Sequence, residues 1–422
     1  MQYSKTTLPN GMRVITVPMH DTKSLTLLVL FGTGSKYETR STSGISHFLE
    51  HLFFKGTKRR PRPGQVHQEL DDVGAEHNAF TSKELTGYWV KVDSRRFDLA
   101  LDIVSDILLD PLFDAKEIEK ERGVILQEMS MYMDSPMRRV HEVFESLLYG
   151  DQPAGWETIG TKEVISSLKR AEFAKYRESQ YVGSNAVVIV AGNFAEDMAG
   201  KRIHQIFSKI KKGSPKPKLK VKEAQKSPKV SIEYKDTDQS HVVIGVRGYT
   251  MFDEDRYAAA LLATILGGKT SSRLFREIRE KRGLAYALMA DAEHYTDSGY
   301  LSVYVGTPHD KLKEVVRRVV EAFAKIRREG VSERELSRAK DFYRGHLAIG
   351  LESSDEVASF FGTQELFKKA LMTPEAVMER IQAVTTKDLQ RAANFMFRPE
   401  KLNVAIIGPH KDPQPFRVLL KL

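Results

Sequence analysis

The sequence predicts an α+β protein made of two duplicated domains of mixed strands and helices, and an internal repeat carries that prediction. In the first half, a helix-like stretch that starts at Leu168 leads to an apolar run that ends at Gly192. In the second half, a similar stretch from Val384 leads to an apolar run that ends at Gly408, with the same spacing of 24 residues. An amphipathic helix followed by a buried strand in each half is the pattern of a duplicated domain.

A Lys- and Pro-rich segment separates the two copies of the repeat. Residues 209–229 contain nine lysines, three prolines and a single acidic residue, Glu223, so they carry +8 of the chain's formal charge of +9. We expect this segment to be an extended, solvated linker between domains formed by residues 1–208 and 230–422. Because the rest of the chain sums to only +1, the basic balance does not predict nucleic-acid binding, although the linker could contact an acidic partner.

Composition favours a large soluble enzyme. The chain has 422 residues with 41% hydrophobic content, enough for two cores, and no apolar run approaches the ~20 residues of a membrane helix. A strand-like stretch at residues 12–17 follows the start almost directly, without a signal or transit pattern, so the expected location is cytoplasmic. The absence of Cys excludes disulfides and thiolate ligands and leaves His and carboxylate groups to bind a metal.

The segment His47-Phe48-Leu49-Glu50-His51 is the strongest chemical signal in the chain. Residues four apart lie above one another on a helix, so His47 and His51 can reach one zinc ion, with Glu50 beside them. Two imidazoles and a third ligand leave a position open for water, whose proton a carboxylate can accept. Ser43 is the expected N-cap of this helix, and the order of residues is that of the inverzincin motif.

A second helix is predicted from Asp114 to Met133, where Asp114 and Glu117 form a capping-box pattern. Glu121 and Glu128 are two turns apart and share a face of this helix. Carboxylates on a half-buried face are costly unless they are paired or bind a metal, so the third ligand is expected here. The pattern alone does not say which of the two it is.

Two further segments are candidates for binding. Residues 78–81 read as a strand whose free edge could pair with an extended peptide, or as an ordinary edge strand. The run from Gly267 to Phe275 begins after an expected helix over residues 256–266. It is not a phosphate loop, because the first glycine of that motif would fall at Ala263 and a helix rather than a strand precedes it.

Taken together, these segments resemble the pitrilysin-type (M16) zinc metallopeptidases, the family of insulin-degrading enzyme and the mitochondrial processing peptidase, and most closely its short two-domain members. The resemblance spans nearly the whole chain and implies the LuxS/metallopeptidase-like sandwich fold. The residues 44–51 and 54–57 match the active-site helix, and residues 121–128 match the second signature, with Gln127 where relatives often have Glu. This implies that Glu128 is the third zinc ligand and that Glu121 is a supporting catalytic carboxylate.

The same resemblance assigns substrate-binding roles to four residues. Asn78 and Ala79 lie on the edge strand beside the metal, and Arg279 and Tyr286 form a pair that binds substrate and can donate to the carbonyl oxygen. Residues 1–208 would then be the catalytic, zinc-binding domain, and residues 230–422 the substrate-binding domain. Only the first half retains the metal motif.

The implied function is that of a zinc endopeptidase with one Zn²⁺ per chain and Glu50 as general base on a metal-bound water. Its substrates are expected to be peptides or unfolded segments enclosed by a homodimer whose site is shared between protomers. Two alternatives stay open: a non-catalytic scaffold, which the intact motif disfavours, and a dedicated processing peptidase, which differs only in specificity. The sequence does not name the physiological substrate.

Overall fold

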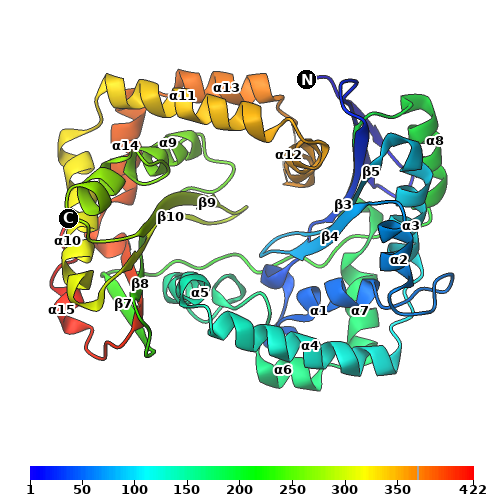
Figure 1. Ribbon diagram of the computed structural model, residues 1–422, viewed down its shortest axis with the longest axis horizontal. Coiled ribbons are helices and arrows are strands. Elements are labelled where there is room, and N and C mark those ends of the chain that lie inside the picture. Colours follow the sequence, from blue (N-terminus) through cyan, green and yellow to red (C-terminus); the bar gives the residue numbers. More distant parts are fainter. Residues whose placement is uncertain (368–369) are drawn as a thin grey trace. The chain divides into compact units, whose positions relative to one another are not determined.

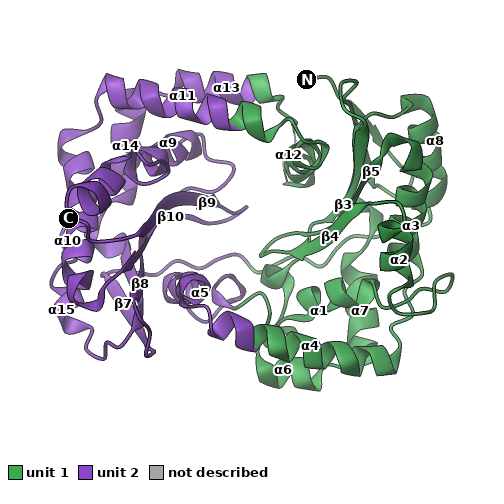
Figure 2. Ribbon diagram, in the orientation of Figure 1, with its two compact units in different colours: residues 1–129, 157–219, 347–375 green, residues 130–156, 220–346, 376–422 purple. Residues whose placement is uncertain are grey.

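The chain folds into two compact units, which Figure 2 shows in different colours. The computed structural model describes residues 1–367 and 370–422. Unit 1 comprises residues 1–129, 157–219 and 347–375, whereas unit 2 comprises residues 130–156, 220–346 and 376–422. Three segments of chain thus build each unit, which differs from the two continuous domains expected from the sequence.

Unit 1 is organised around a six-stranded sheet with the strand order β1-β2-β6-β3-β5-β4; Figure 1 labels β3, β4 and β5 of this sheet. The pair β2–β6 is parallel, and the other neighbours are antiparallel. The central strand β3 is an almost continuous apolar run because both of its faces are covered. The strands are β1 (Ser4–Thr7), β2 (Arg13–Pro18), β3 (Ser24–Phe31), β4 (Glu76–Thr81), β5 (Thr86–Asp93) and β6 (Ala186–Gly192).

Unit 2 repeats this topology with five strands in the order β7-β11-β8-β10-β9. As in unit 1, one pair of strands is parallel, β7–β11. The order β7-β11-β8-β10-β9 corresponds to β2-β6-β3-β5-β4 of unit 1, so the strands that close the predicted repeat, β11 and β6, take the same position. The repeat is therefore confirmed: α7 (Arg170–Gln180) leads to β6, and α14 (Thr386–Met396) leads to β11. The strands are β7 (Lys229–Tyr234), β8 (Ser240–Arg247), β9 (Ala287–His294), β10 (Gly299–Thr307) and β11 (Leu402–Gly408).

Each sheet is covered on one face by a single helix that comes from the opposite half of the sequence. In unit 1, α12 (Ser354–Phe367) packs against β2, β3 and β6, and its Phe361 joins Leu28 and Ile189 in one apolar cluster. In unit 2, α5 (Pro136–Tyr149) packs in the same way against β8 and β11 (Figures 1 and 2). This exchange covers the second face of each sheet, which would otherwise expose apolar side chains.

The remaining helices cover the other faces or flank the sheets. Unit 1 holds α1 (Ile45–Phe53), α2 (Gln65–Asp71), α3 (Phe97–Leu109), most of α4 (Ala115–Met133), α6 (Lys162–Ser167) and α8 (Glu196–Phe207). Unit 2 holds α9 (Arg256–Leu266), α10 (Leu312–Glu329), most of α11 (Glu333–Gly350) and of α13 (Pro374–Ala383), and α15 (Gln414–Arg417). Within the described part of the chain, no helix combines the length and the apolar character needed to cross a bilayer.

The Lys- and Pro-rich segment has no regular secondary structure before Lys229, as expected, but it is not a free solvated linker. Its first part is held to unit 1, where the Lys216 carbonyl accepts from Gln180 and Lys218 Nζ lies 3.3 Å from Glu84. Its second part is held to unit 2, where Gln225 donates to the Leu402 carbonyl. Proline and charge patterns gave no indication of these contacts, because the partners are distant in the sequence.

Candidate metal centre

Helix α1 presents the predicted metal-binding residues on one edge and buries the other. Phe48, Leu49 and Leu52 are at most 1% exposed and fix the helix on the core of unit 1. His47 and His51 consequently lie on the edge that is partly exposed, with ring centroids 4.8 Å apart. The i, i+4 spacing therefore brings the two imidazoles together, as the sequence predicted.

Glu128 from α4 completes a three-residue cluster. Its Oε2 lies 3.6 Å from His47 Nε2 and 3.6 Å from His51 Nε2, and one donor atom from each residue lies within 4.8 Å of the others. Two ligands of a tetrahedral zinc ion are about 3.4 Å apart when each bond is about 2.1 Å long. Two imidazole nitrogens and a carboxylate oxygen at these separations fit zinc and leave a coordination position without a protein ligand.

Glu121 lies behind His51 rather than among the donor atoms. Its Oε2 accepts from His51 Nδ1 at 3.2 Å, and its Oε1 lies 2.8 Å from Lys55 Nζ. Burial opposes ionisation of this carboxyl, but the hydrogen bonds from His51 and Lys55 hold its pKa below the ordinary value. An ionised Glu121 keeps the proton on His51 Nδ1 and so directs Nε2 toward the cluster, as metal-binding histidines require.

Glu50 lies beside the cluster with one oxygen fixed. Its Oε2 accepts a 2.6 Å hydrogen bond from the Thr81 hydroxyl at the end of β4. Burial raises the pKa of Glu50, and the Thr81 hydrogen bond and His51 oppose that rise. A carboxylate with a raised pKa is a stronger proton acceptor than an exposed one, which suits a general base.

A small pocket connects this carboxylate to the edge strand. It has a volume of about 230 Å³ and is lined by Glu50, His51, Phe54, Lys55, His67, His77, Asn78 and Ala79. Strand β4 is the last strand of its sheet, so the edge expected from the sequence is present. The Asn78 side chain accepts from the Ala79 N–H at 2.9 Å, and a peptide pairing with β4 would take over that donor.

The N-terminus of α1 is held by a residue that the sequence analysis missed. The N-cap is Gly44, not Ser43, and no side chain at that position caps the helix. Instead, Glu38 accepts from the Gly44 N–H at 2.7 Å and from the Ser46 N–H at 2.9 Å. Gly44 has φ +89°, and a Cβ there would lie 2.5 Å from the Ile159 carbonyl oxygen, so a capping side chain cannot replace it. A carboxylate six residues before the N-cap has no capping signature in sequence.

This buried carboxylate should make stability depend on pH. Burial raises the pKa of Glu38 from the ordinary 4.5 to about 7, against the opposing effect of its two backbone hydrogen bonds. The folded chain therefore holds a proton that the unfolded chain releases, and stability falls as pH rises from 4.5 to about 7. In the Glu38→Gln variant, we expect the free energy of unfolding to fall by up to about 3 kcal/mol less over this pH range.

Urea unfolding of zinc-free wild-type and Glu38→Gln protein across this pH range measures the effect, since zinc binding itself depends on pH. The difference between the two proteins isolates Glu38 from other titrating groups, such as Glu293, whose pKa is also raised to about 7. Parallel stability curves for the two proteins would contradict the assignment of a raised pKa to Glu38.

Arg279 and Tyr286 lie in unit 2 and contact each other. The Arg279 guanidinium carbon is 4.7 Å from the centre of the Tyr286 ring and 4.9 Å from that of Phe275. Tyr286 is 77% exposed within the chain, which is unusual for an aromatic side chain. The expected helix over residues 256–266 is confirmed as α9, and Arg279 belongs to a short π-helix, η6 (Phe275–Glu280), that the sequence did not predict.

Two family models match most of the chain. The family model described as "Insulinase (Peptidase family M16)" matches residues 13–162, and the one described as "Peptidase M16 inactive domain" matches residues 167–343. All residues of α1 and α4, including Glu128, thus fall within the first match.

Relatives align along nearly the full chain. An uncharacterized zinc protease of Mycobacterium leprae is 34% identical over 99% of this chain and 95% of its own. A second, from Bacillus subtilis, is 32% identical over 96% of this chain and 97% of its own. Among solved structures, a protease from Helicobacter pylori superposes with a TM-score of 0.90 at 25% identity, covering 97% of this chain and 99% of that one.

Proposed function

The chain belongs to peptidase family M16, whose matching relatives are named zinc proteases, and on that premise we propose that it is a zinc-dependent endopeptidase. The proposed substrates are peptides and unfolded polypeptide segments. One Zn²⁺ per chain would be held by His47, His51 and Glu128. The observation that carries the proposal is the convergence of these three side chains beside Glu50, a carboxylate outside the donor set.

When bound, the zinc ion supplies a Lewis acid that polarises the scissile carbonyl and acidifies water. Glu50 takes the proton of the attacking water, because Thr81 holds its Oε2 and leaves Oε1 for that proton. The same carboxyl then returns the proton to the leaving amine, as a general acid. Glu121 acts through His51, which it orients, and is a positioning residue rather than a proton carrier.

Strand β4 would hold the substrate in an extended conformation. A peptide that adds to its free edge hydrogen-bonds through the backbone, so binding depends on extension more than on sequence. Asn78 and Ala79, together with His77, are the residues of this strand that line the pocket beside Glu50. This mode of binding favours broad specificity over the narrow specificity of a dedicated processing peptidase.

We further propose that two copies of the chain form a homodimer that encloses the substrate and shares its sites. The chain carries both the metal-binding residues and the Arg279/Tyr286 pair, so a two-fold dimer contains two complete sets. In this arrangement, Arg279 and Tyr286 of one protomer would serve the zinc ion of the other. Their donors would stabilise the oxyanion formed on the scissile carbonyl.

An unfolded chain should be cut and the same chain in its folded state should resist. The sharpest comparison uses one small disulfide-bonded protein, first native and then reduced and alkylated, so that sequence and length are identical. We expect rapid cleavage only of the reduced form, loss of cleavage with a zinc chelator, and recovery on adding Zn²⁺. Mass spectrometry of the products measures the outcome. Equal cleavage of both forms would contradict the enclosed site, and absence of cleavage in either would favour a non-catalytic scaffold.

A further inference from the structure

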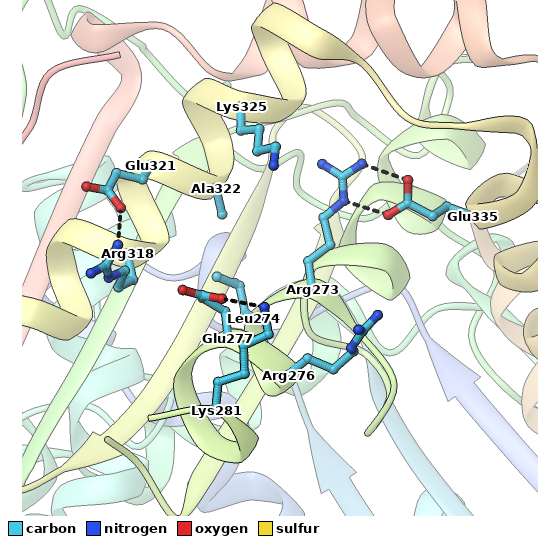
Figure 3. A pocket seen from close by; sticks show the side chains of 10 residues that line it. All are labelled: Arg273, Leu274, Arg276, Glu277, Lys281, Arg318, Glu321, Ala322, Lys325 and Glu335. Atoms are coloured by element: carbon cyan, nitrogen blue, oxygen red, sulfur yellow. Dashed lines mark hydrogen bonds and ion pairs between the residues drawn. The ribbon is translucent and has the colours of Figure 1, made fainter. Parts of the chain in front are cut away.

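Unit 2 contains a pocket that the proposed peptidase chemistry does not use. It has a volume of about 500 Å³ and lies between the π-helix η6 and α10 (Figure 3). Pockets of this volume are within the range that holds small organic ligands. Its lining is Arg273, Leu274, Arg276, Glu277, Lys281, Arg318, Glu321, Ala322, Lys325 and Glu335.

The carboxylates of the lining already have cationic partners. Glu335 makes two hydrogen bonds with Arg273, of 2.7 and 2.8 Å, and Glu321 lies 3.0 Å from Arg318. Glu277 accepts from Arg282, outside the pocket, at 2.9 Å and lies 3.4 Å from Lys281. All three carboxylates of the lining are therefore already paired, and none of them pairs with the remaining cations.

Two cations of the lining have no carboxylate partner among the lining residues. Lys325 extends from α10 toward the centre of the pocket in Figure 3, and its nearest ion-pair partner, Glu329, is 3.8 Å away. Arg276, on η6, has no carboxylate within ion-pair distance among the described residues. With five basic and three acidic side chains, the lining has a formal charge of +2. A concave surface with unneutralised positive charge concentrates anions.

The segment that carries Arg276 also carries the proposed substrate-binding arginine. The Lys281 N–H donates to the Arg276 carbonyl at 3.0 Å, the i→i+5 bond of a π-helix, and such turns often occur at functional sites. Arg279, three residues further along, contacts the rings of Phe275 and Tyr286. A ligand that binds Arg276 would therefore restrain the same short helix that positions Arg279.

From these observations we propose that the pocket between η6 and α10 binds a small, multiply charged organic anion, held by Arg276 and Lys325 from its two walls. The phosphate and carboxylate groups of such a ligand both accept hydrogen bonds from guanidinium and ammonium groups. The ligand is not a peptidase substrate, so the site is independent of the proposed catalytic function.

Calorimetric titration of the full-length, zinc-loaded protein tests the proposal with two probes, fructose 1,6-bisphosphate and glutarate, at about 50 mM salt, where screening is modest. We expect one site per chain for at least one probe, and the two titrations tell a phosphate ligand from a dicarboxylate. The double variant Arg276→Ala/Lys325→Ala should weaken binding about tenfold or more, because two charged contacts are lost. No saturable binding of either probe would overturn the proposal.

A matched control separates a site from general attraction to a basic protein. Lys313→Ala/Arg334→Ala removes the same charge from exposed positions of unit 2 that do not line the pocket, and should leave affinity within about twofold. Equal weakening by both double variants would overturn the proposal. Hydrogen exchange gives a second readout: the bound probe should slow amide exchange in residues 275–286 of the wild type but not of the Arg276→Ala/Lys325→Ala protein.

Discussion

Glu50→Gln should keep its zinc and lose peptide hydrolysis. The amide is nearly isosteric with the carboxylate and can still accept the Thr81 hydrogen bond, but it cannot take a proton from water. We expect kcat/KM to fall by roughly 10²–10⁴, the usual contribution of a general base. Zinc content by elemental analysis and cleavage of an unstructured peptide measure the two properties separately.

His51→Ala and Glu128→Ala are the matched comparisons, because they remove ligands rather than the base. Both should lose zinc, and with it activity, whereas Glu50→Gln should lose activity alone. An activity of Glu50→Gln within about tenfold of the wild type would contradict the role of Glu50. Loss of zinc from Glu50→Gln would instead place this carboxylate among the ligands.

The local part of the site could be predicted from sequence because helical spacing determines it. His47, Glu50 and His51 lie within two turns of one helix, so their common edge follows from 3.6 residues per turn once the apolar face is recognised. The same reasoning placed Glu121 and Glu128 on one face of α4. It did not distinguish them, because the distinction depends on Lys55, which pairs with Glu121 and lies on a different segment.

Contacts between distant segments account for what the sequence did not predict. Glu38 holds the N-terminus of α1 through backbone N–H groups, and these carry no residue-specific signal. Helix α5 is amphipathic in sequence, whereas α12 has no clear apolar stripe, and in neither helix does a local pattern say that it covers the sheet of the opposite half of the chain. The repeat was visible because a buried final strand leaves a continuous apolar run, whereas the exchange of helices leaves the pattern of each half unchanged.

The basic segment shows why charge alone was misleading. Its lysines predicted a solvated linker, but Lys218 lies beside Glu84, which is 4% exposed and also binds buried Lys36 at 2.8 Å. A buried carboxylate needs paired cations, and one of them comes from the apparent linker. The positive charge of residues 209–229 therefore contributes in part to the packing of unit 1.

Two inactive variants should recover activity when mixed, if the site is shared across a dimer. Consider a mixed dimer of one Glu50→Gln chain and one Tyr286→Phe chain. The zinc site of the Tyr286→Phe chain has its own intact Glu50 and receives an intact Tyr286 from the Glu50→Gln chain. The other site carries both substitutions. With random exchange, half of the dimers are mixed and each has one intact site, so activity should reach about one quarter of the wild type.

Subunit exchange must be confirmed by native mass spectrometry, and each variant alone must be folded and severely impaired. The matched control mixes Glu50→Gln with the doubly substituted Glu50→Gln/Tyr286→Phe chain, which leaves no intact site in any pairing and should give no recovery. Tyr286 is well suited to the test because it is 77% exposed. Tyr286→Phe should therefore disturb folding much less than a substitution in the core. Confirmed mixed dimers without recovery would mean that Tyr286 serves the metal of its own chain. If each site were built within one protomer, both sites of a mixed dimer would be damaged, one by Glu50→Gln and the other by Tyr286→Phe.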